Sequence, residues 1–466
     1  MPHELADKRV TVMGLGTRGG GLGVARWLVD QGARVTITDL RSEPELSDSI
    51  EALGDLDVRL ALGGHDERDF TPAGADLVVR NPGVRLTSRY LQFARSSGVP
   101  IEMEMSLFLR RCPAPVIGIT GTKGKTTTSL LCGAMLTAWN SKTIIAGNMG
   151  VTALGRLASI TEDTPVVLEL SSWQVEALRE HRLAPHIAVL TNISEDHLDA
   201  YDSFEDYANT KRSLVQNLSA DGFAVLNRDD PETRKAGVDT IGCIARFGAE
   251  PGTMNGCWIA ARTLIWRWRG DETTIELPPT SALAGAHQPW NAAAAVAAAF
   301  LYGAPPEAIA AGLQAFAGAP HRQERIATVD GVLYVNDSAA TAPAAAISAL
   351  KSFRERRIHL IAGGSDKKAD LSAFVAEAGA SAHRIYLLKG AATEKLESML
   401  APWSDAIAGV FTSMDAAVEA AANAAGQGDV VLLAPACASF GMFHDEFDRG
   451  DQFRASVLKR QTSVHA

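Results

Sequence analysis

Val116-Ile-Gly-Ile-Thr-Gly-Thr-Lys-Gly-Lys-Thr-Thr-Thr128 is the stretch that decides the fold of this chain. Its apolar first half is typical of a buried strand ending at Thr120, and a helix is expected over 127–138. Between them, backbone N–H groups can surround phosphate oxygens, a lysine adds positive charge, and a threonine hydroxyl can bind Mg²⁺. The sequence therefore predicts a nucleoside triphosphate site. It is a shortened variant of the phosphate loop, because Ile119 stands where the general pattern has glycine.

Size and composition limit what the chain can be. Its 466 residues suggest two to four domains, and 46% apolar with 21% charged residues is typical of a globular protein. The net charge of −10 argues against sequence-independent nucleic-acid binding. No signal-peptide core is present, the five cysteines lack metal-binding spacing, and the longest apolar stretch is shorter than the ~20 residues that cross a bilayer. We expect a soluble, cytoplasmic monomer with no membrane partner.

Strands and helices alternate from end to end, which predicts an α/β fold with mainly parallel sheets. Proline-containing segments at 111–115 and 318–322 divide the chain into three expected domains, 1–111, 112–319 and 320–466. The first and third would be Rossmann-like, and the central one would be an ATPase of the phosphate-loop type. The expected strands are 9–14, 34–39, 75–80, 116–120, 166–170, 187–193, 223–227, 333–336, 358–363, 384–388 and 430–434, with an antiparallel meander over 257–277.

A second glycine-rich turn follows the first expected strand. Gly14-Leu-Gly-Thr-Arg-Gly19 matches G-x-G-x-x-G, and Asp39 closes the next strand. Together they form a dinucleotide fingerprint that would suit a nicotinamide-dependent dehydrogenase. The same geometry binds any nucleotide that carries a pyrophosphate, so the base is left open. A purely structural turn is a further alternative.

Polar residues follow the strands of the central domain. Glu169 ends the strand at 166–170 and is placed to bind Mg²⁺, although an acid before a helix capped by Ser171 or Ser172 is the alternative. His197 follows two acids at the end of another strand and is a second candidate ligand. From spacing alone, Lys211 is expected to be a solvated lysine. In the third domain, polar turns at 336–341, 363–368 and 434–439 predict a ligand crevice at one sheet edge.

Taken together these segments resemble the ATP-dependent murein (Mur) ligase family over nearly the whole chain. The resemblance rests on motifs that occur in the family's order: Gly121–Thr127, Gly147–Gly150, Leu168–Gln174, Asn192–Asp199 with Lys211, His287–Asn291, Pro320–Arg322, Asn336–Thr341, and Pro435–Ser439 with Phe447–Gly450. It implies an ADP-forming ligase that joins D-glutamate to UDP-N-acetylmuramoyl-L-alanine through an acyl phosphate. The product would be a precursor of peptidoglycan.

The resemblance also implies the role of each site residue. The catalytic residues would be Lys125, Glu169, His197 and Lys211. The UDP-substrate would meet Thr17, Arg18, Asp39, Arg41, Asn81, Asn148, Ser171, Gln174 and His197. ATP would meet Gly121, Thr122, Lys123, Gly124, Lys125, Thr126, Thr127, His287, Asn291, Arg322 and Asp337. Glutamate would meet Thr341, Lys367, Ser439 and Phe443. Two Mg²⁺ ions would be held by Thr126, Glu169, His197 and Lys211, the last as a carbamylated lysine.

Three positions depart from the family pattern. Ala339 stands where better-known members have a lysine beside the amino-acid pocket, and Glu446 stands where many have an aromatic residue. Gln288 replaces an asparagine near the adenine. A lost cation and an added anion would reshape the glutamate pocket, so a relative that adds L-glutamate stays an alternative.

Overall fold

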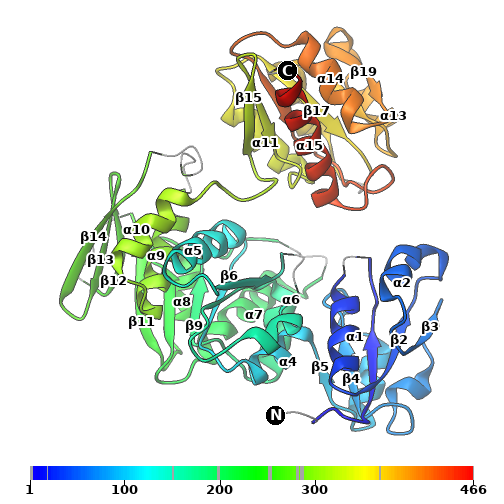
Figure 1. The fold of residues 1–466 in the computed structure, drawn as a ribbon, viewed down its shortest axis with the longest axis vertical. Helices are drawn as coiled ribbons and strands as arrows, with labels where there is room; N and C mark the ends of the chain where they lie inside the picture. Colours follow the sequence, from blue (N-terminus) through cyan, green and yellow to red (C-terminus); the bar gives the residue numbers. More distant parts are fainter. Residues whose placement is uncertain are drawn as a thin grey trace. The chain divides into compact units, whose positions relative to one another are not determined.

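The computed structural model describes residues 4–17, 19–149, 152–196, 200–249, 254–279, 283, 288–366 and 369–464. The chain divides into two compact units, Met1–Ala317 and Gly318–Ala466. The first unit contains two sheets and the second contains one (Figure 1). All three are mainly parallel and are accompanied by helices, which confirms the predicted α/β class. The predicted domain limits at 111/112 and 319/320 stay predictions.

The first sheet is parallel throughout, in the order β3-β2-β1-β4-β5. Because the order reverses between β1 and β4, the loops that follow these two strands meet at a switch point where ligands bind. The strands are β1 (Arg9–Met13), β2 (Arg34–Asp39), β3 (Val58–Leu62), β4 (Leu77–Arg80) and β5 (Ile101–Glu102). The helices are α1 (Gly20–Asp30), α2 (Ser47–Leu53), α3 (Arg89–Ser96) and α4 (Glu104–Arg111), with short 3-10 turns η1 (Pro44–Leu46) and η2 (Glu67–Phe70).

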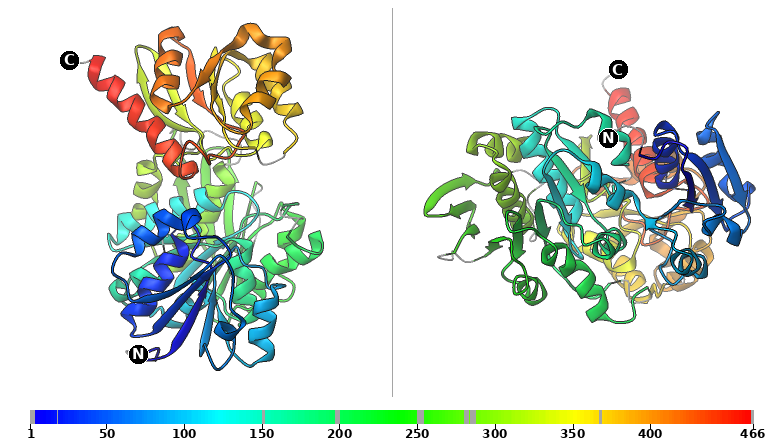
Figure 2. Two further views of the ribbon diagram at one scale, coloured as in Figure 1. Left: turned by 90° about the vertical axis from the view of Figure 1, so that its right-hand side faces the viewer. Right: turned by 90° about the horizontal axis from the view of Figure 1, so that it is seen from below.

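The second sheet has the order β14-β13-β12-β11-β10-β9-β6-β8-β7. It is parallel from β7 to β12, and β12–β14 form the predicted antiparallel meander, drawn in green in Figure 2. The strands are β6 (Val116–Thr120), β7 (Ile144–Gly147), β8 (Val166–Glu169), β9 (Ile187–Leu190), β10 (Phe223–Asn227), β11 (Cys243–Gly248), β12 (Gly256–Ala260), β13 (Thr263–Trp268) and β14 (Asp271–Glu276).

Helices cover both faces of this sheet. Alternate residues of β6 and β8 enter different cores, as a pleated strand requires: Ile117 and Val167 on one side, Val116 and Leu168 on the other. The first core includes α5 (Lys125–Trp139), α9 (Gln288–Tyr302) and α10 (Pro306–Ala315). The second includes α6 (Ser172–Glu180), α7 (Phe204–Gln216) and α8 (Pro231–Ala236). The 3-10 turn η3 (Leu154–Ser159) follows β7.

The helix that follows the phosphate turn, α5, is packed very closely. It lies against both α9 and α10. At Gly312 of α10 an added Cβ would come within 2.3 Å of the Met135 Cα, so backbone meets backbone there. On α9, every residue from Ala292 to Ala299 is fully buried, and all but Val296 are alanine. The small side chains therefore bring α5 close to its neighbours.

The second unit has one sheet in the order β15-β16-β20-β17-β18-β19, with β15 antiparallel to β16 and the other pairs parallel. The loops after β16, β20 and β17 therefore lie side by side. The strands are β15 (Glu324–Val329), β16 (Val332–Asn336), β17 (Ile358–Gly363), β18 (Ala382–Leu388), β19 (Ile407–Phe411) and β20 (Val430–Leu433). The helices are α11 (Pro343–Ser352), α12 (Ser372–Ser381), α13 (Thr393–Met399), α14 (Met414–Ala424) and α15 (Glu446–Val464), with the 3-10 turn η5 (Ala401–Ala406).

Five predicted strands extend beyond those observed: 9–14, 75–80, 166–170, 187–193 and 430–434. The case of 187–193 bears on the site. The run 187–193 was expected to be a single strand, but β9 ends at Leu190. Beyond it the chain turns toward the phosphate loop, where the Asn192 carbonyl accepts a hydrogen bond from the Thr122 N–H at 2.8 Å. In the described part of the chain, no helix is long and apolar enough to cross a membrane.

Candidate active site

The phosphate turn needs glycine at two positions. Gly121 has φ +149° and Gly124 has φ +83°, values that favour glycine. A Cβ at Gly121 would stand 1.9 Å from the Thr191 hydroxyl, and one at Gly124 would stand 2.4 Å from Oδ1 of Asn291. The turn is therefore enclosed by the end of β9 and the start of α9. Asn291, a predicted ATP residue, does lie beside the turn.

Residues after β9 hold the turn in shape. The Lys123 N–H donates to Oδ1 of Asn192 at 2.9 Å, and the Thr191 hydroxyl donates to the Lys123 carbonyl at 2.7 Å. The Thr122 hydroxyl donates to the Ser194 carbonyl at 3.1 Å and accepts from the Ser194 N–H at 3.0 Å. Sequence analysis did not assign this supporting role to Thr191 and Asn192. The signal was present, since both directly follow a strand that pairs with β6.

The start of α5 is suited to bind an anion. Its N-cap is Gly124, which offers no side-chain cap, and its first turn has no acidic residue. The first N–H groups of a helix have no partner within the helix itself, and the helix dipole favours negative charge. The Lys125 ammonium donates to the carbonyls of Gly121 and Thr122 at 3.1 and 3.0 Å. The lysine is therefore folded back over the turn that phosphate oxygens would fill.

A buried carboxylate lies on the neighbouring strand. β8 pairs directly with β6, as expected, and Glu169 at its end is 2% exposed. Its Oε1 accepts a hydrogen bond from the Asn148 amide at 3.1 Å, while Oε2 is buried without a hydrogen-bond partner among the described residues. A carboxylate oxygen buried in this way fits a cation, and oxygen ligands are those that Mg²⁺ takes. Glu169 therefore fits the metal role.

A complete metal site does not follow from the described residues alone. Among them, no group of three or more histidine, cysteine, aspartate or glutamate side chains is arranged to hold a metal ion. The predicted second ligand, His197, lies outside the described residues, as do Arg18, His287 and Lys367.

Lys211 is buried, so the expectation of a solvated lysine from spacing alone is wrong. Its side chain on α7 is 1% exposed, with Nζ 3.4 Å from the Thr120 hydroxyl and 5.0 Å from the centroid of the Tyr207 ring. Burial, and then the positive charge of Lys125, hold the pKa of Lys211 well below its ordinary value. The helix period contained the signal: Tyr207, Lys211 and Val215 are four residues apart and share a buried face.

The first sheet also has its glycine turn at the switch point. The Asn81 amide after β4 lies over this turn and donates to the Gly14 carbonyl at 3.4 Å. Asp39 accepts from the N–H groups of Gly16 and Arg41 at 3.1 and 3.0 Å. The Asp39 carboxylate therefore stabilises the conformation of the glycine turn. Thr17 and Arg41 are exposed at the same edge.

Two predicted substrate residues contact each other. Ser171 is the N-cap of α6, and its hydroxyl accepts from the Gln174 N–H at 3.3 Å. Oε1 of Gln174 accepts in return from the Ser171 N–H at 2.9 Å. This capping box confirms the alternative that Ser171 caps the helix. Any contact of these two side chains with a substrate stays a prediction.

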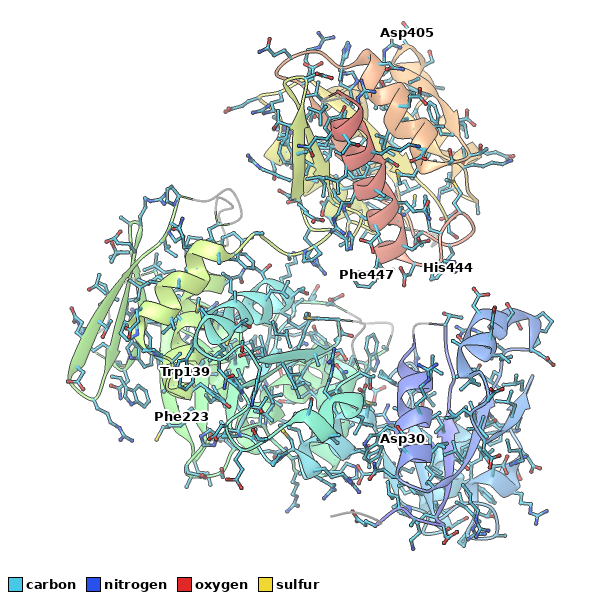
Figure 3. All side chains as sticks on the ribbon, in the orientation of Figure 1. Asp30, Trp139, Phe223, Asp405, His444 and Phe447 are labelled. Carbon is cyan, nitrogen blue, oxygen red and sulfur yellow. The ribbon has the colours of Figure 1, made fainter. Side chains whose placement is uncertain are left out.

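The second unit gathers the predicted polar loops at one sheet edge. Asp337 after β16 is buried and accepts from the Gln323 N–H at 3.2 Å, while Arg322 is exposed. Ser439 after β20 is 2% exposed, and its hydroxyl has no partner among the described residues. Phe443 is buried in the apolar core. Two aromatic residues of this region are exposed: Phe440, which follows Ser439, and Phe447, near the start of α15 (Figure 3).

Arg449 ties two of these loops together, a role that sequence analysis missed. It is fully buried on α15. Its guanidinium donates to the Ser338 hydroxyl at 2.9 Å, to the Ser338 carbonyl at 2.8 Å and to the Cys437 carbonyl at 3.2 Å. Burial lowers its pKa to about 10. Arg449 belongs to the Phe447–Gly450 motif, but nothing in the spacing of that motif indicates that the arginine is buried.

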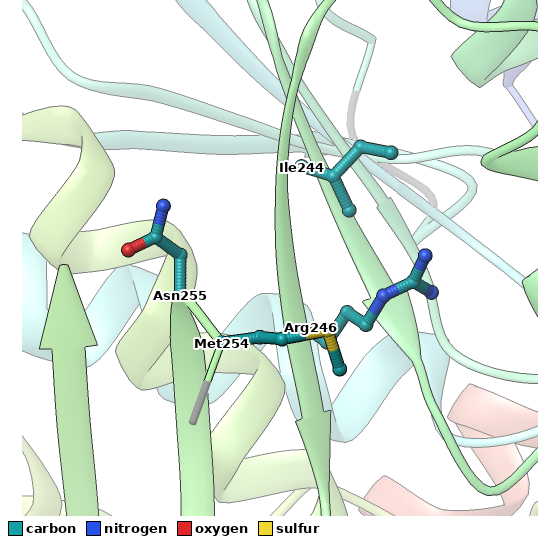
Figure 4. A pocket seen from close by; sticks show the side chains of 4 residues that line it. All are labelled: Ile244, Arg246, Met254 and Asn255. Carbon is teal, nitrogen blue, oxygen red and sulfur yellow. The ribbon is translucent and has the colours of Figure 1, made fainter. Parts of the chain in front are cut away.

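The two most evident recesses of the surface lie elsewhere. One, of about 420 Å³, is lined by Ile244, Arg246, Met254 and Asn255 (Figure 4). The other, of about 660 Å³, includes Pro115 and His186, which precede β6 and β9, and so lies at the edge opposite the phosphate turn. Neither is lined by a predicted site residue. The candidate site is instead formed by strand-end loops.

Asp337→Asn is expected to stabilise the protein at neutral pH. Burial raises the pKa of Asp337 from 3.8 to about 6. The pKa of Asp337 is higher in the folded protein than in the unfolded chain. The stability that protonated Asp337 contributes is therefore present at low pH and is lost as the pH rises through about 6. A shift of this size corresponds to at most ~3 kcal/mol. Thermal unfolding should show a higher Tm for the variant at pH ~7.5, and the difference should shrink at pH ~4.5. An equal difference at both values would contradict this.

These features define a class of protein: a phosphate-loop enzyme in which a buried carboxylate and a buried lysine lie beside the nucleotide turn. Comparison of the sequence with known protein families identifies related proteins. The chain matches the "Mur ligase MurD-like, N-terminal domain" over 8–102, the "Mur ligase middle domain" over 119–299 and the "Mur ligase, glutamate ligase domain" over 321–437.

Similar proteins cover the whole chain. UDP-N-acetylmuramoylalanine--D-glutamate ligase of Roseiflexus sp. (strain RS-1) is 46% identical, over 97% of this chain and 99% of its own. The protein of the same name from Geobacter metallireducens (strain ATCC 53774 / DSM 7210 / GS-15) is 38% identical, over 97% and 98%. The structure of UDP-N-acetylmuramate-alanine ligase MurC from Thermotoga maritima has a TM-score of 0.61 at 20% identity, over 98% of this chain and 100% of that one, and supports the fold. The chain belongs to the Mur ligase family.

Proposed function

We propose that this chain is an ADP-forming ligase that joins D-glutamate to UDP-N-acetylmuramoyl-L-alanine, in the synthesis of peptidoglycan precursors. Mur ligases are ATP-dependent and need Mg²⁺, and the relatives at 36–46% identity over the full chain are named for this reaction. The dehydrogenase alternative has no support among these relatives. The glycine turn after β1 is accordingly proposed to hold the uridine diphosphate. A cytoplasmic location and a monomeric state stay predictions.

One observation supports this proposal most strongly. The phosphate turn is bordered by Lys125, by the buried carboxylate of Glu169 and by the buried amine of Lys211. An acyl-phosphate reaction must bring a substrate carboxylate to a triphosphate, and two anions approach each other only where positive charge offsets their repulsion. Lys125 and the N-terminus of α5 would supply part of this charge.

The reaction would proceed in two steps. A carboxylate oxygen of the alanyl group attacks the γ-phosphorus, the bond from phosphorus to the bridging oxygen breaks, and ADP leaves. The glutamate amine then attacks the acyl carbon, the carbon–oxygen bond breaks, phosphate leaves, and the nitrogen loses a proton. Lys125 would stay near the γ-phosphate oxygens as charge moves among them. The N–H groups of Lys125 and Thr126, at the start of α5, would hold the β-phosphate.

Bound Mg²⁺ would neutralise the triphosphate and polarise the γ-phosphoryl group. We propose that Glu169, Thr126 and His197 hold it, with Lys211 as a carbamate. A neutral amine adds to carbon dioxide, whereas an ammonium does not. The depressed pKa of Lys211 therefore favours the modification, and a carbamate would replace a buried cation with an anion beside the metal. The number of ions, two, is part of the proposal.

The remaining predicted residues are proposed for substrate contacts. Asn291, Arg322 and Asp337 are each proposed to contact ATP. Ser439, whose buried hydroxyl has no described partner, is a suitable donor for a glutamate carboxylate. Thr341, Phe443 and Lys367 are proposed for the same pocket. Ala339 and Glu446 leave L-glutamate as the alternative amino acid.

The test is a steady-state assay of ADP release with UDP-N-acetylmuramoyl-L-alanine and either enantiomer of glutamate. We expect release to require both substrates and Mg²⁺, and kcat/KM for D-glutamate to exceed that for the L-form by at least about 10²-fold, as for a site in which a mispositioned polar group is left unpaired. Turnover with neither enantiomer would refute the proposal. Preference for the L-form would establish the alternative.

A further inference from the structure

A buried glutamate outside the catalytic residues lies close to the substrate loop. Glu104 is the first residue of α4, the helix that leads from the first sheet to the second. Its side chain is 9% exposed, and no basic side chain pairs with it among the described residues. A buried carboxylate needs hydrogen bonds to offset lost hydration. The partners in those hydrogen bonds identify the segment that Glu104 stabilises.

All of these bonds come from one short segment. The Thr152 hydroxyl donates to Oε1 of Glu104 at 2.6 Å, and the Ala153 N–H donates to the same oxygen at 2.7 Å. The Leu154 N–H also bonds the carboxylate. Burial raises the pKa of Glu104 even though these bonds favour the ionised form. Glu104 thus holds the chain just after the Gly147–Gly150 motif.

The other end of that motif is held by a second carboxylate. The Asn148 N–H donates to the Glu169 carbonyl at 2.9 Å, and its side-chain amide donates to Oε1 of Glu169 at 3.1 Å. Glu169 therefore holds Asn148, which is proposed to touch the UDP-substrate, and Glu104 holds Thr152, which follows a few residues along the chain. A loop held at both ends loses less entropy when a ligand binds.

A third element confines the same threonine. Gly23 of α1, the helix that follows the first glycine turn, lies against Thr152. A Cβ at Gly23 would stand 2.7 Å from the Cγ2 atom of Thr152 and 3.1 Å from its hydroxyl. Thr152 thus contacts both α1, through Gly23, and α4, through Glu104.

We propose that Glu104 is a positioning residue that fixes the Asn148 segment through Thr152 and thereby sets the affinity for the UDP-substrate. The inference rests on the proposed function, since it takes a nucleotide sugar as the ligand of this segment. It assigns Glu104 no contact with a substrate.

Three substitutions on three elements test this. Glu104→Ala removes the acceptor and should raise both Kd and KM for UDP-N-acetylmuramoyl-L-alanine about 10-fold or more, the size expected for loss of a hydrogen bond to a charged group. Thr152→Val removes the donor at nearly constant shape, and Gly23→Ala adds a methyl group against Thr152. Both should shift the same two constants, while Kd for ATP and kcat change by less than about twofold. Glu104→Gln keeps an acceptor oxygen and should restore most of the affinity.

The matched control is Glu102→Gln. Glu102 lies two residues away and pairs with His181 and Arg110 instead of the loop, so substrate affinity should be unchanged. Calorimetric titration gives Kd, and thermal unfolding reports stability separately. A double-mutant cycle of Glu104→Ala with Thr152→Val should be non-additive, because each substitution removes the same hydrogen bond.

The outcomes separate this inference from the proposed function. If the wild-type chain neither binds nor turns over the UDP-substrate, the proposed function fails. If it does both and a folded Glu104→Ala variant binds with unchanged Kd, the positioning role is refuted. If Glu104→Ala does not fold, unchanged affinity in both Thr152→Val and Gly23→Ala refutes it equally.

Discussion

Lys125→Ala is expected to lower ADP release by about 10²–10³-fold, the usual cost of removing one donor from a charge-stabilising site. The Lys125 ammonium lies over the phosphate turn at hydrogen-bond distance from the carbonyls of Gly121 and Thr122. Its charge is therefore placed where the γ-phosphate must be stabilised as it transfers. Kd for the UDP-substrate should change by less than about twofold, because that ligand is proposed to bind through the loops of the first sheet and Asn148.

Lys142→Ala provides the control for this prediction. Lys142 is an exposed lysine in the turn after α5, at the opposite end of the helix from Lys125. The same truncation there should leave turnover and both affinities unchanged. If Lys125→Ala loses UDP-substrate binding together with turnover, the assignment of the UDP-substrate to residues away from the phosphate turn is wrong.

Lys211→Ala should lower turnover by a similar factor, about 10²–10³-fold, and short carboxylates such as formate or acetate should restore part of it. The substitution leaves a cavity beside Thr120 and Tyr207 that such an anion can enter. If the functional form of Lys211 is a carbamate, the added carboxylate replaces the missing group. An unmodified ammonium would not be replaced by an anion.

Two further variants make the rescue specific. Added carboxylate should not restore Lys125→Ala, where a cation is missing. Lys211→Met should be inactive but should melt at a higher temperature than an unmodified enzyme, since it removes a buried amine whose only described hydrogen bond is long. Absence of rescue at any carboxylate concentration that leaves the wild type active would refute the carbamate role.

The strands predicted with the correct limits share one property. β2, β6, β10 and β17 have neighbours on both sides in parallel parts of their sheets. β6, β10 and β17 are mostly apolar runs, as expected for buried parallel strands, whereas β2 alternates apolar and polar residues. The strands that sequence analysis did not identify are β3, β5, β7, β11, β15 and β19. All of these except β11 lie at a sheet edge. One side of an edge strand faces solvent, and the apolar signal is correspondingly weak, as in the partly exposed β3 and β19.

The site shows a similar limit. Gly121, Gly124 and Lys125 could be predicted because the chemistry depends on a local turn, and Glu169 because it ends a strand beside that turn. Glu104 and Arg449 could not be placed from spacing, and the helix period indicates that Lys211 is buried but not what surrounds it. Their roles come from burial among elements distant in the chain: the Arg449 guanidinium bonds Ser338, 111 residues away. A polar side chain in a helix shows its function only when the surrounding fold is known.

The contact between α5 and α10 at Gly312 affects how the phosphate turn can respond to a ligand. Because peptide backbone contacts peptide backbone there, no side chain at this contact can change its rotamer to let α5 move along its axis. The phosphate turn at the N-terminus of α5 is therefore rigidly supported, and the nucleotide would bind to a site that is already formed. Conformational changes during a catalytic cycle are therefore expected in the segments and ligands that contact the phosphate turn, and not in α5 itself.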